Sequence, residues 1–183
     1  ESGGDPKNIP DLTYENFLNF HRTYYHPSNS YIYLYGNMDM EEKLAFLDEH
    51  YLSHFDYLDV DSVIQEQKAF GACRDVTLEY PVAENEGEED NTYLSYNMVV
   101  GNAADSQMAM AFEVLDYALL SAPGAPLKQA LLDVKAGKDV YGSYDDGILQ
   151  PYFTVIAKGS NPDRKEEFVS VIRQVLGDIV KNG

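Results

Sequence analysis

The chain has 183 residues, 44% of them apolar, so it is long enough to bury a hydrophobic core. Its 31 acidic and 13 basic residues give a formal net charge of −18, which argues against nucleic-acid and anionic-membrane partners, because both need clustered Lys and Arg. No apolar run approaches the roughly 20 residues of a membrane span. A single cysteine, Cys73, favours a reducing compartment, so we expect a cytoplasmic protein. The opening ESGGDP has neither an initiator Met nor a signal peptide, and we expect a longer parent protein.

The first part of the chain is predicted to form a helix, a strand and a second helix. Apolar and aromatic residues at three- and four-residue spacings predict a helix over 13–26, which Pro27 ends. Residues 29–35 alternate and are rich in Tyr and Ile, as in a strand. Asp39, with Glu42 three positions on, is typical of a capping box at the start of the second helix. Its apolar stripe consists of Met40, Leu44, Leu47, Tyr51 and Phe55.

The middle of the chain loses this periodicity. Residues 56–74 are expected to be a connector, and residues 75–80 a short strand closed by Pro81. The acidic run ENEGEED (84–90) is predicted to be a solvated loop, and residues 92–100 a further strand.

The last part of the chain is predicted to pack helices on a sheet. Asp105 is expected to cap a helix over 106–120 that is apolar nearly all round, and therefore buried. SAPGAP breaks this helix, and Pro126 suits the first position of a shorter one ending near 134. Residues 140–144 and 152–157 flank a turn containing DDG, which indicates an antiparallel hairpin.

Asn161 and Pro162 are expected to open the final helix as its cap and first residue. Its predicted buried face consists of Phe168, Ile172, Val175, Leu176 and Ile179. These elements together predict an α+β fold, with helices packed on a mixed or antiparallel sheet.

His50 and His54 form the best metal candidate. Histidines four apart on a helix face the same way and can share one zinc ion. Zinc-peptidase patterns, however, place Glu at positions that hold Tyr51 and Ser53 here. Packing beside the apolar stripe explains the pair without a metal. A metal-binding acidic module nevertheless stays open as an alternative.

The remaining candidates for catalysis lack complete motifs. His21 lies on the apolar face of the first helix and His26 in its last turn, where it is expected to interact with the terminal carbonyls. This pair therefore marks the junction of a helix with the following strand. Cys73 has no histidine near it in the sequence and is expected to be an unreactive thiol. No glycine-rich phosphate loop or calcium loop is present.

Two long stretches carry a family resemblance. Residues 2–52, which include LTYENF, FHRTYYHPSNS and YGNMD, resemble the end of the first domain of pitrilysin/insulinase-type zinc metallopeptidases, in the presequence-protease-like branch. The stretch LLSAPGAPLKQALLDVKAGKDVYGSYDDGILQPYFTVIAKGSNPD resembles the second domain of the same family. The resemblance implies that residues 1–57 are the C-terminal part of the first peptidase domain and that residues 58–74 are a connector. Residues 75–183 would then be the N-terminal part of the second peptidase domain.

The resemblance also implies the activity of a parent enzyme. Family members enclose unfolded peptides in a chamber and hold zinc with an inverted H-x-x-E-H motif and a distal Glu. No H-x-x-E-H occurs here, so the resemblance places the motif before residue 1. We therefore expect no catalytic and no metal-binding residue in this chain, with zinc bound by the rest of the parent. The expected partners are unfolded peptides and the remaining domains of the parent chain.

One family feature maps onto residues of this sequence. In insulinase-type members a small-residue loop and an adjacent edge strand anchor the substrate. The corresponding residues here are Ser121, Pro123, Gly124, Ala125, Tyr141, Gly142 and Ser143. The alternatives are a plain helix–helix turn and hairpin, and a peptidase-like structural subunit that has lost its motif.

Overall fold

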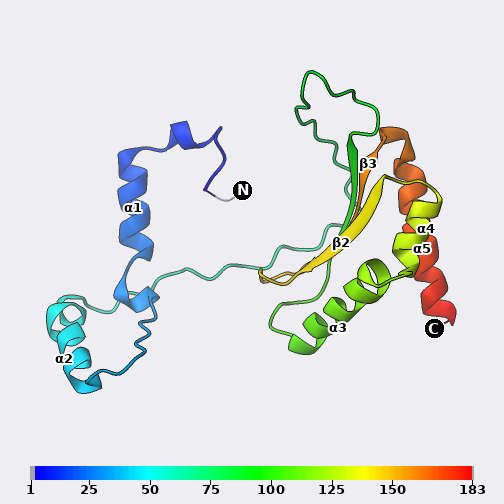
Figure 1. Ribbon diagram of the computed structural model, residues 1–183. Coiled ribbons are helices and arrows are strands. Elements are labelled where there is room, and N and C mark those ends of the chain that lie inside the picture. The colour runs from blue at the N-terminus through cyan, green and yellow to red at the C-terminus, as the bar shows by residue number, and fades with distance from the viewer. Residues whose placement is uncertain (1–2, 183) are drawn as a thin grey trace. The chain divides into compact units, whose positions relative to one another are not determined.

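The structure is a computed structural model that describes residues 3–182. It divides into two compact units, Glu1–Gln65 and Glu66–Gly183, which are described separately (Figure 1).

The described part of the first unit contains two α-helices and three short 3₁₀ turns. The helices are α1 (Tyr14–Tyr24) and α2 (Met40–His50), and the turns are Ile9–Asp11, Pro27–Asn29 and Leu52–His54. Side-chain caps set both helix starts: the Thr13 hydroxyl accepts from the Asn16 N–H at 3.1 Å, and the Asp39 carboxylate from the Glu42 N–H at 3.0 Å. The predicted start at Asp39 is confirmed.

No residue among 3–65 is buried in the structure. The apolar face of α1 is open to solvent, with Tyr14 75% and Phe17 67% exposed. The strand predicted for 29–35 is wrong, since 31–35 have no regular structure. A strand needs a hydrogen-bonded neighbour, and the described part of this unit offers none.

Residues 56–91 contain no helix or strand. The short strand predicted for 75–80 is therefore wrong as well. Its apolar side chains Val76 and Leu78 stay 70% and 83% exposed, so alternation alone did not suffice to form a ladder. The acidic run 84–90 is irregular, as predicted.

The second unit is built on a three-stranded antiparallel sheet. Its strands are β1 (Thr92–Val99), β2 (Asp139–Asp145) and β3 (Tyr152–Ser160), in the order β1-β3-β2. Leu94 of β1 and Val140 of β2 both lie opposite Ala157 of β3. The predicted strand after the acidic loop and the predicted hairpin are confirmed, as is the α+β fold.

Three helices belong to this unit. α3 (Ser106–Asp116) continues into a π-helical turn (Tyr117–Ser121), and α4 (Pro126–Asp133) follows. A 3₁₀ turn (Pro162–Arg164) leads into α5 (Lys165–Asn182). Asp105 caps α3 by accepting from the Met108 N–H at 3.0 Å, and Pro126 opens α4, both as predicted. Asn161 and Pro162 are the N-cap and first residue of the 3₁₀ turn before α5, as predicted, although the Asn161 side chain makes no capping hydrogen bond there.

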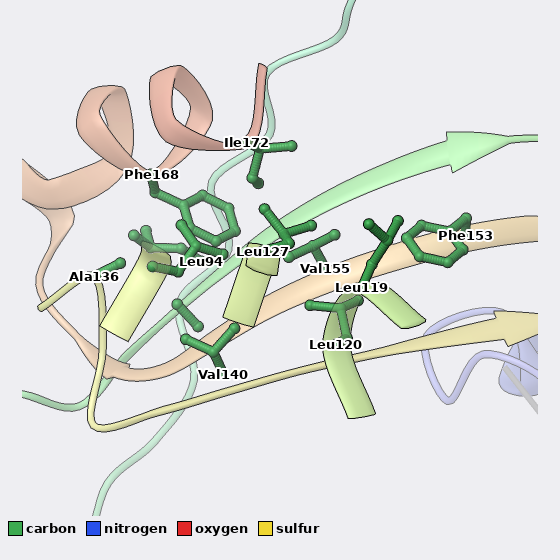
Figure 2. Packing of buried hydrophobic residues seen from close by; sticks show 12 residues of the cluster. Leu94, Leu119, Leu120, Leu127, Ala136, Val140, Phe153, Val155, Phe168 and Ile172 are labelled. Atoms are coloured by element: carbon green, nitrogen blue, oxygen red, sulfur yellow. The ribbon is translucent and has the colours of Figure 1, made fainter. Parts of the chain in front are cut away.

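The core lies between the helices and one face of the sheet (Figure 2). It consists of Leu94, Leu119, Leu120, Leu127, Leu131, Ala136, Val140, Phe153, Val155, Ala157, Phe168 and Ile172. Each large apolar side chain buried in this way stabilises the fold by about 1.5–3 kcal/mol. On the opposite face Thr154 is buried, and its hydroxyl is satisfied by donating to the Asn97 side-chain oxygen at 2.9 Å.

The predicted burial of the helix over 106–120 holds only for its last turn. Leu119 and Leu120 are buried, whereas Met110 and Val114 are 66% and 62% exposed. The described chain covers only one stripe of α3, although the helix is apolar nearly all round. The predicted face of α5 is buried at Phe168 and Ile172, while Val175, Leu176 and Ile179 are partly buried.

Candidate functional site

The predicted small-residue loop lines a surface pocket of about 290 Å³. The loop follows the π-helical turn. Within the loop, Gly124 adopts a φ of +73°, which residues with a side chain disfavour. The Ala125 N–H closes the loop by donating to the Ala122 carbonyl at 3.0 Å. Four lining residues come from the predicted set: Ser121, Pro123, Gly124 and Ala125.

The second predicted segment lies in the middle of an edge strand. Because β3 is the central strand, β2 pairs on one side only within the described residues. Tyr141 and Ser143 are exposed, and Gly142 between them faces the helices. The free side of β2 therefore offers backbone groups to an added strand.

Gly142 brings the two predicted segments together. A Cβ at this position would come within 2.3 Å of a Leu120 methyl group and 2.5 Å of the Thr154 carbonyl oxygen. Only glycine therefore allows the π-helical turn to approach β2 this closely. Leu120 directly precedes Ser121, so the loop begins where this contact ends. The Lys128 ammonium, 3.6 Å from the Asp139 carboxylate, makes a second link between α4 and β2.

Asp116 lies at the same contact and was not identified from the sequence. Its Oδ1 is buried without a hydrogen-bond partner, and it would lie 3.4 Å from a Cβ at position 142. Burial raises the pKa of this carboxyl group above its usual value of 3.8. The sequence gives no signal for it, because the burial arises where α3 crosses a strand that lies more than twenty residues further along the chain.

The His50/His54 pair does not have the geometry expected for a metal site. α2 ends at His50, and His54 belongs to the separate turn Leu52–His54. The pair is therefore not one helical turn apart, and the shared helix assumed for it is wrong. The His50 ring stacks on Phe46, with 4.4 Å between centroids. Among residues 3–182, no group of three or more His, Cys, Asp or Glu side chains is placed to hold a metal ion.

His21 and His26 contact other residues of the first unit, and the cysteine is exposed. α1 ends before Pro27, as predicted, but Nδ1 of His26 accepts from the Ser28 N–H at 3.2 Å and does not cap the helix carbonyls. The His21 ring stacks on Tyr25 at 4.7 Å. Cys73 is exposed. None of the helices in the described range has the length and apolar character required to cross a bilayer.

Comparison with known proteins shows one family over nearly the whole chain. Residues 11–183 match the family described as the peptidase M16 inactive domain. Protein HypA of Clostridium perfringens is 47% identical over the full chain, and presequence protease 1, chloroplastic/mitochondrial, of Arabidopsis thaliana is 34% identical. The mitochondrial presequence protease of Xenopus laevis is 30% identical.

The chain spans only 17–19% of the length of these relatives. The names of the two presequence proteases place them in mitochondria or chloroplasts, which gives no support to a cytoplasmic location for this chain. The predicted family is confirmed. The chain belongs to the M16 peptidases, the pitrilysin/insulinase family, in the presequence-protease-like branch.

Proposed function

We propose that this chain is a non-catalytic segment of a zinc-dependent metalloendopeptidase that degrades peptides. In this proposal it forms part of the chamber wall and anchors the substrate at β2. The family description as an inactive domain and the presequence proteases among the relatives support the peptidase context. We also propose that residues 1–57 and 75–183 belong to successive domains, with 58–74 as the connector.

The unpaired side of β2 beside the small-residue loop carries the anchoring role. An extended peptide can add to such an edge through main-chain hydrogen bonds, and small residues such as Gly124 and Ala125 let a second backbone approach. The net charge of −18 favours basic peptides over acidic ones.

Zinc would be held elsewhere in the parent. The residues described here do not fit a zinc site, because His50 at the end of α2 and His54 in the following turn have no third ligand placed with them. We therefore expect the purified chain to bind no stoichiometric zinc after dialysis and to hydrolyse no peptide. Chelator-sensitive hydrolysis by the pure chain would contradict the non-catalytic role.

Photo-crosslinking tests the anchor directly. The photoreactive residue p-benzoylphenylalanine replaces Tyr141 on β2 in one variant and Val99 on β1 in the control. Both side chains are exposed and both lie on edge strands, so the two variants report on the two edges of the sheet. A labelled, basic, unfolded peptide is expected to crosslink at position 141 and not at 99. Equal crosslinking at the two positions, or none at 141, would refute anchoring at β2.

A further inference from the structure

Charge is distributed very unevenly along the chain. Residues 1–127 contain 23 acidic and five basic side chains, whereas residues 128–183 contain eight of each. The whole net charge therefore belongs to the first 127 residues. Residues 75–91, the acidic strap, carry seven acidic side chains and no basic one.

Asp90 attaches one end of the acidic strap to the second unit. Its carboxylate lies 3.3 Å from the Lys138 ammonium, just before β2. Asp90 and Asn161 also exchange two hydrogen bonds: the Asp90 N–H donates to the Asn161 side-chain oxygen at 2.9 Å, and the Asn161 amide donates to the Asp90 carboxylate at 2.8 Å. These bonds, together with Lys138, hold the pKa of Asp90 below its usual value. The backbone here has a φ of +58°, which a non-glycine residue adopts at a cost that the Asn161 bonds offset.

Asp75 attaches the other end of the acidic strap. It forms an ion pair with Lys165, the first residue of α5. Asn161, the other attachment after β3, lies only four residues before Lys165. Both ends of the strap are therefore fixed at the same end of the sheet, by residues 138, 161 and 165.

The acidic strap is not packed against this surface as a hydrophobic layer. A pocket of about 560 Å³, lined by Tyr80, Val82 and Glu86 of the strap and by Lys138 and Lys158 of the sheet, lies between them. Val76 and Leu78 remain mostly exposed. The Tyr80 ring of the strap contacts the Tyr93 ring of β1 edge-on, with 5.9 Å between centroids, but both side chains stay nearly half exposed. Charge and hydrogen bonds, more than apolar burial, thus hold the strap in place.

We propose that residues 75–91 form a releasable electrostatic strap, clasped at Asp90, that opens at raised ionic strength and uncovers the recess containing Lys138 and Lys158. Salt shortens the range of charge interactions from about 10 Å at 0.1 M to about 3 Å at 1 M, so it weakens the strap. The apolar core is not weakened in this way, because salt screening does not act on hydrophobic burial. Release therefore leaves the sheet and helices folded.

Hydrogen–deuterium exchange of the whole 183-residue chain tests this proposal. Backbone exchange is measured by mass spectrometry in low and high salt, separately for peptides that contain the Asp90 N–H, which donates to Asn161, and for peptides within α5. We expect exchange in the strap to quicken about two- to fivefold in high salt, while α5 stays protected. Asp90→Asn and Lys138→Gln should each produce the faster exchange already in low salt and reduce the effect of adding salt.

Glu88→Gln is the matched control. It removes one negative charge from the same strap, two residues from Asp90, at a side chain with no ion pair among the described residues. The control should exchange like the unmodified chain. Unchanged exchange in Asp90→Asn, an equal effect of Glu88→Gln, or a parallel loss of protection in α5 would each overturn the proposal. The last outcome would indicate general unfolding in place of release.

Discussion

The two units of this chain use the same local rules and differ in burial. Thr13 and Asp39 cap the helices of the first unit much as Asp105 caps α3 in the second. Residues 3–65 nevertheless bury no side chain, whereas twelve residues form a core in the second unit. Helix boundaries therefore follow from local chemistry, while burial requires a facing surface within reach.

This difference has an energetic consequence. α1 and α2 are eleven residues each, and isolated helices shorter than about 12–15 residues are marginal in water. Their exposed apolar faces gain nothing from transfer out of water in this chain. Cooperative stability should therefore reside in the second unit, and paired substitutions can test that.

Phe168→Ala and Phe17→Ala should show the largest difference in the free energy of unfolding between the two units. Phe168 is 1% exposed in the core, and its truncation leaves a cavity that should cost about 3–5 kcal/mol. Phe17 is 67% exposed on α1, and its truncation should stay within about 0.5 kcal/mol. Urea unfolding monitored by circular dichroism measures both. A large loss for Phe17→Ala would show that α1 is packed against a surface in solution, and would break the comparison.

Two glycines in the second unit differ in how closely other atoms approach them, and replacing each by alanine tests this difference. Gly142→Ala forces a methyl group against Leu120 and the Thr154 carbonyl, so we expect a loss of about 1–3 kcal/mol. Gly177 lies within α5 with no atom within 4 Å of an added Cβ. Gly177→Ala should therefore stabilise the protein by about 0.5–1 kcal/mol through helix propensity. An unchanged or raised urea midpoint for Gly142→Ala would mean that the contact at Gly142 is not formed as described.

The same capping change should act differently in the two units. Asp105→Ala removes the cap of α3 and should lower the free energy of unfolding by about 1 kcal/mol. Asp39→Ala removes an equivalent cap from α2, where we expect lower helicity in Cα chemical shifts and no change in the urea midpoint. If both substitutions moved the midpoint equally, the first unit would belong to the cooperative core.

The sequence predicted what depends on a few neighbouring residues. The caps at Asp39 and Asp105, the start of α4 at Pro126 and the hairpin of β2 and β3 all agree with the structure. The small-residue loop and β2 were found through family resemblance, and the structure places them side by side through Leu120 and Gly142. Whether they bind peptide stays a prediction.

What the sequence did not predict depends on distant partners. Residues 29–35 and 75–80 alternate as strands do, yet neither finds a ladder partner. α3 is apolar nearly all round, yet only one stripe meets the sheet. His54 is four residues from His50, yet the helix ends between them. Hydrophobic periodicity describes a single helix or strand by itself. Whether the strands form and which face of α3 is buried depend on the elements packed against them, and the His50/His54 geometry depends on where α2 ends.

Asp116→Asn should have the smallest effect and the clearest dependence on pH. Burial raises the pKa of Asp116 in the folded state, so the folded chain holds this proton more tightly than the unfolded chain. Its stabilising contribution is therefore complete below the ordinary pKa and is lost as the pH rises through the raised value. The side chain is only half-buried, and solvent screening should keep the effect below about 1 kcal/mol. At neutral pH the Asn variant should have the higher urea midpoint, and at pH values below the ordinary pKa the advantage should vanish.

Glu113→Gln is the control, because it makes an equal charge change at an exposed site one turn earlier on α3. Its urea midpoint relative to the unmodified chain should not depend on pH in this way. A matching response there would assign the effect to net charge and not to the unpaired oxygen facing Gly142.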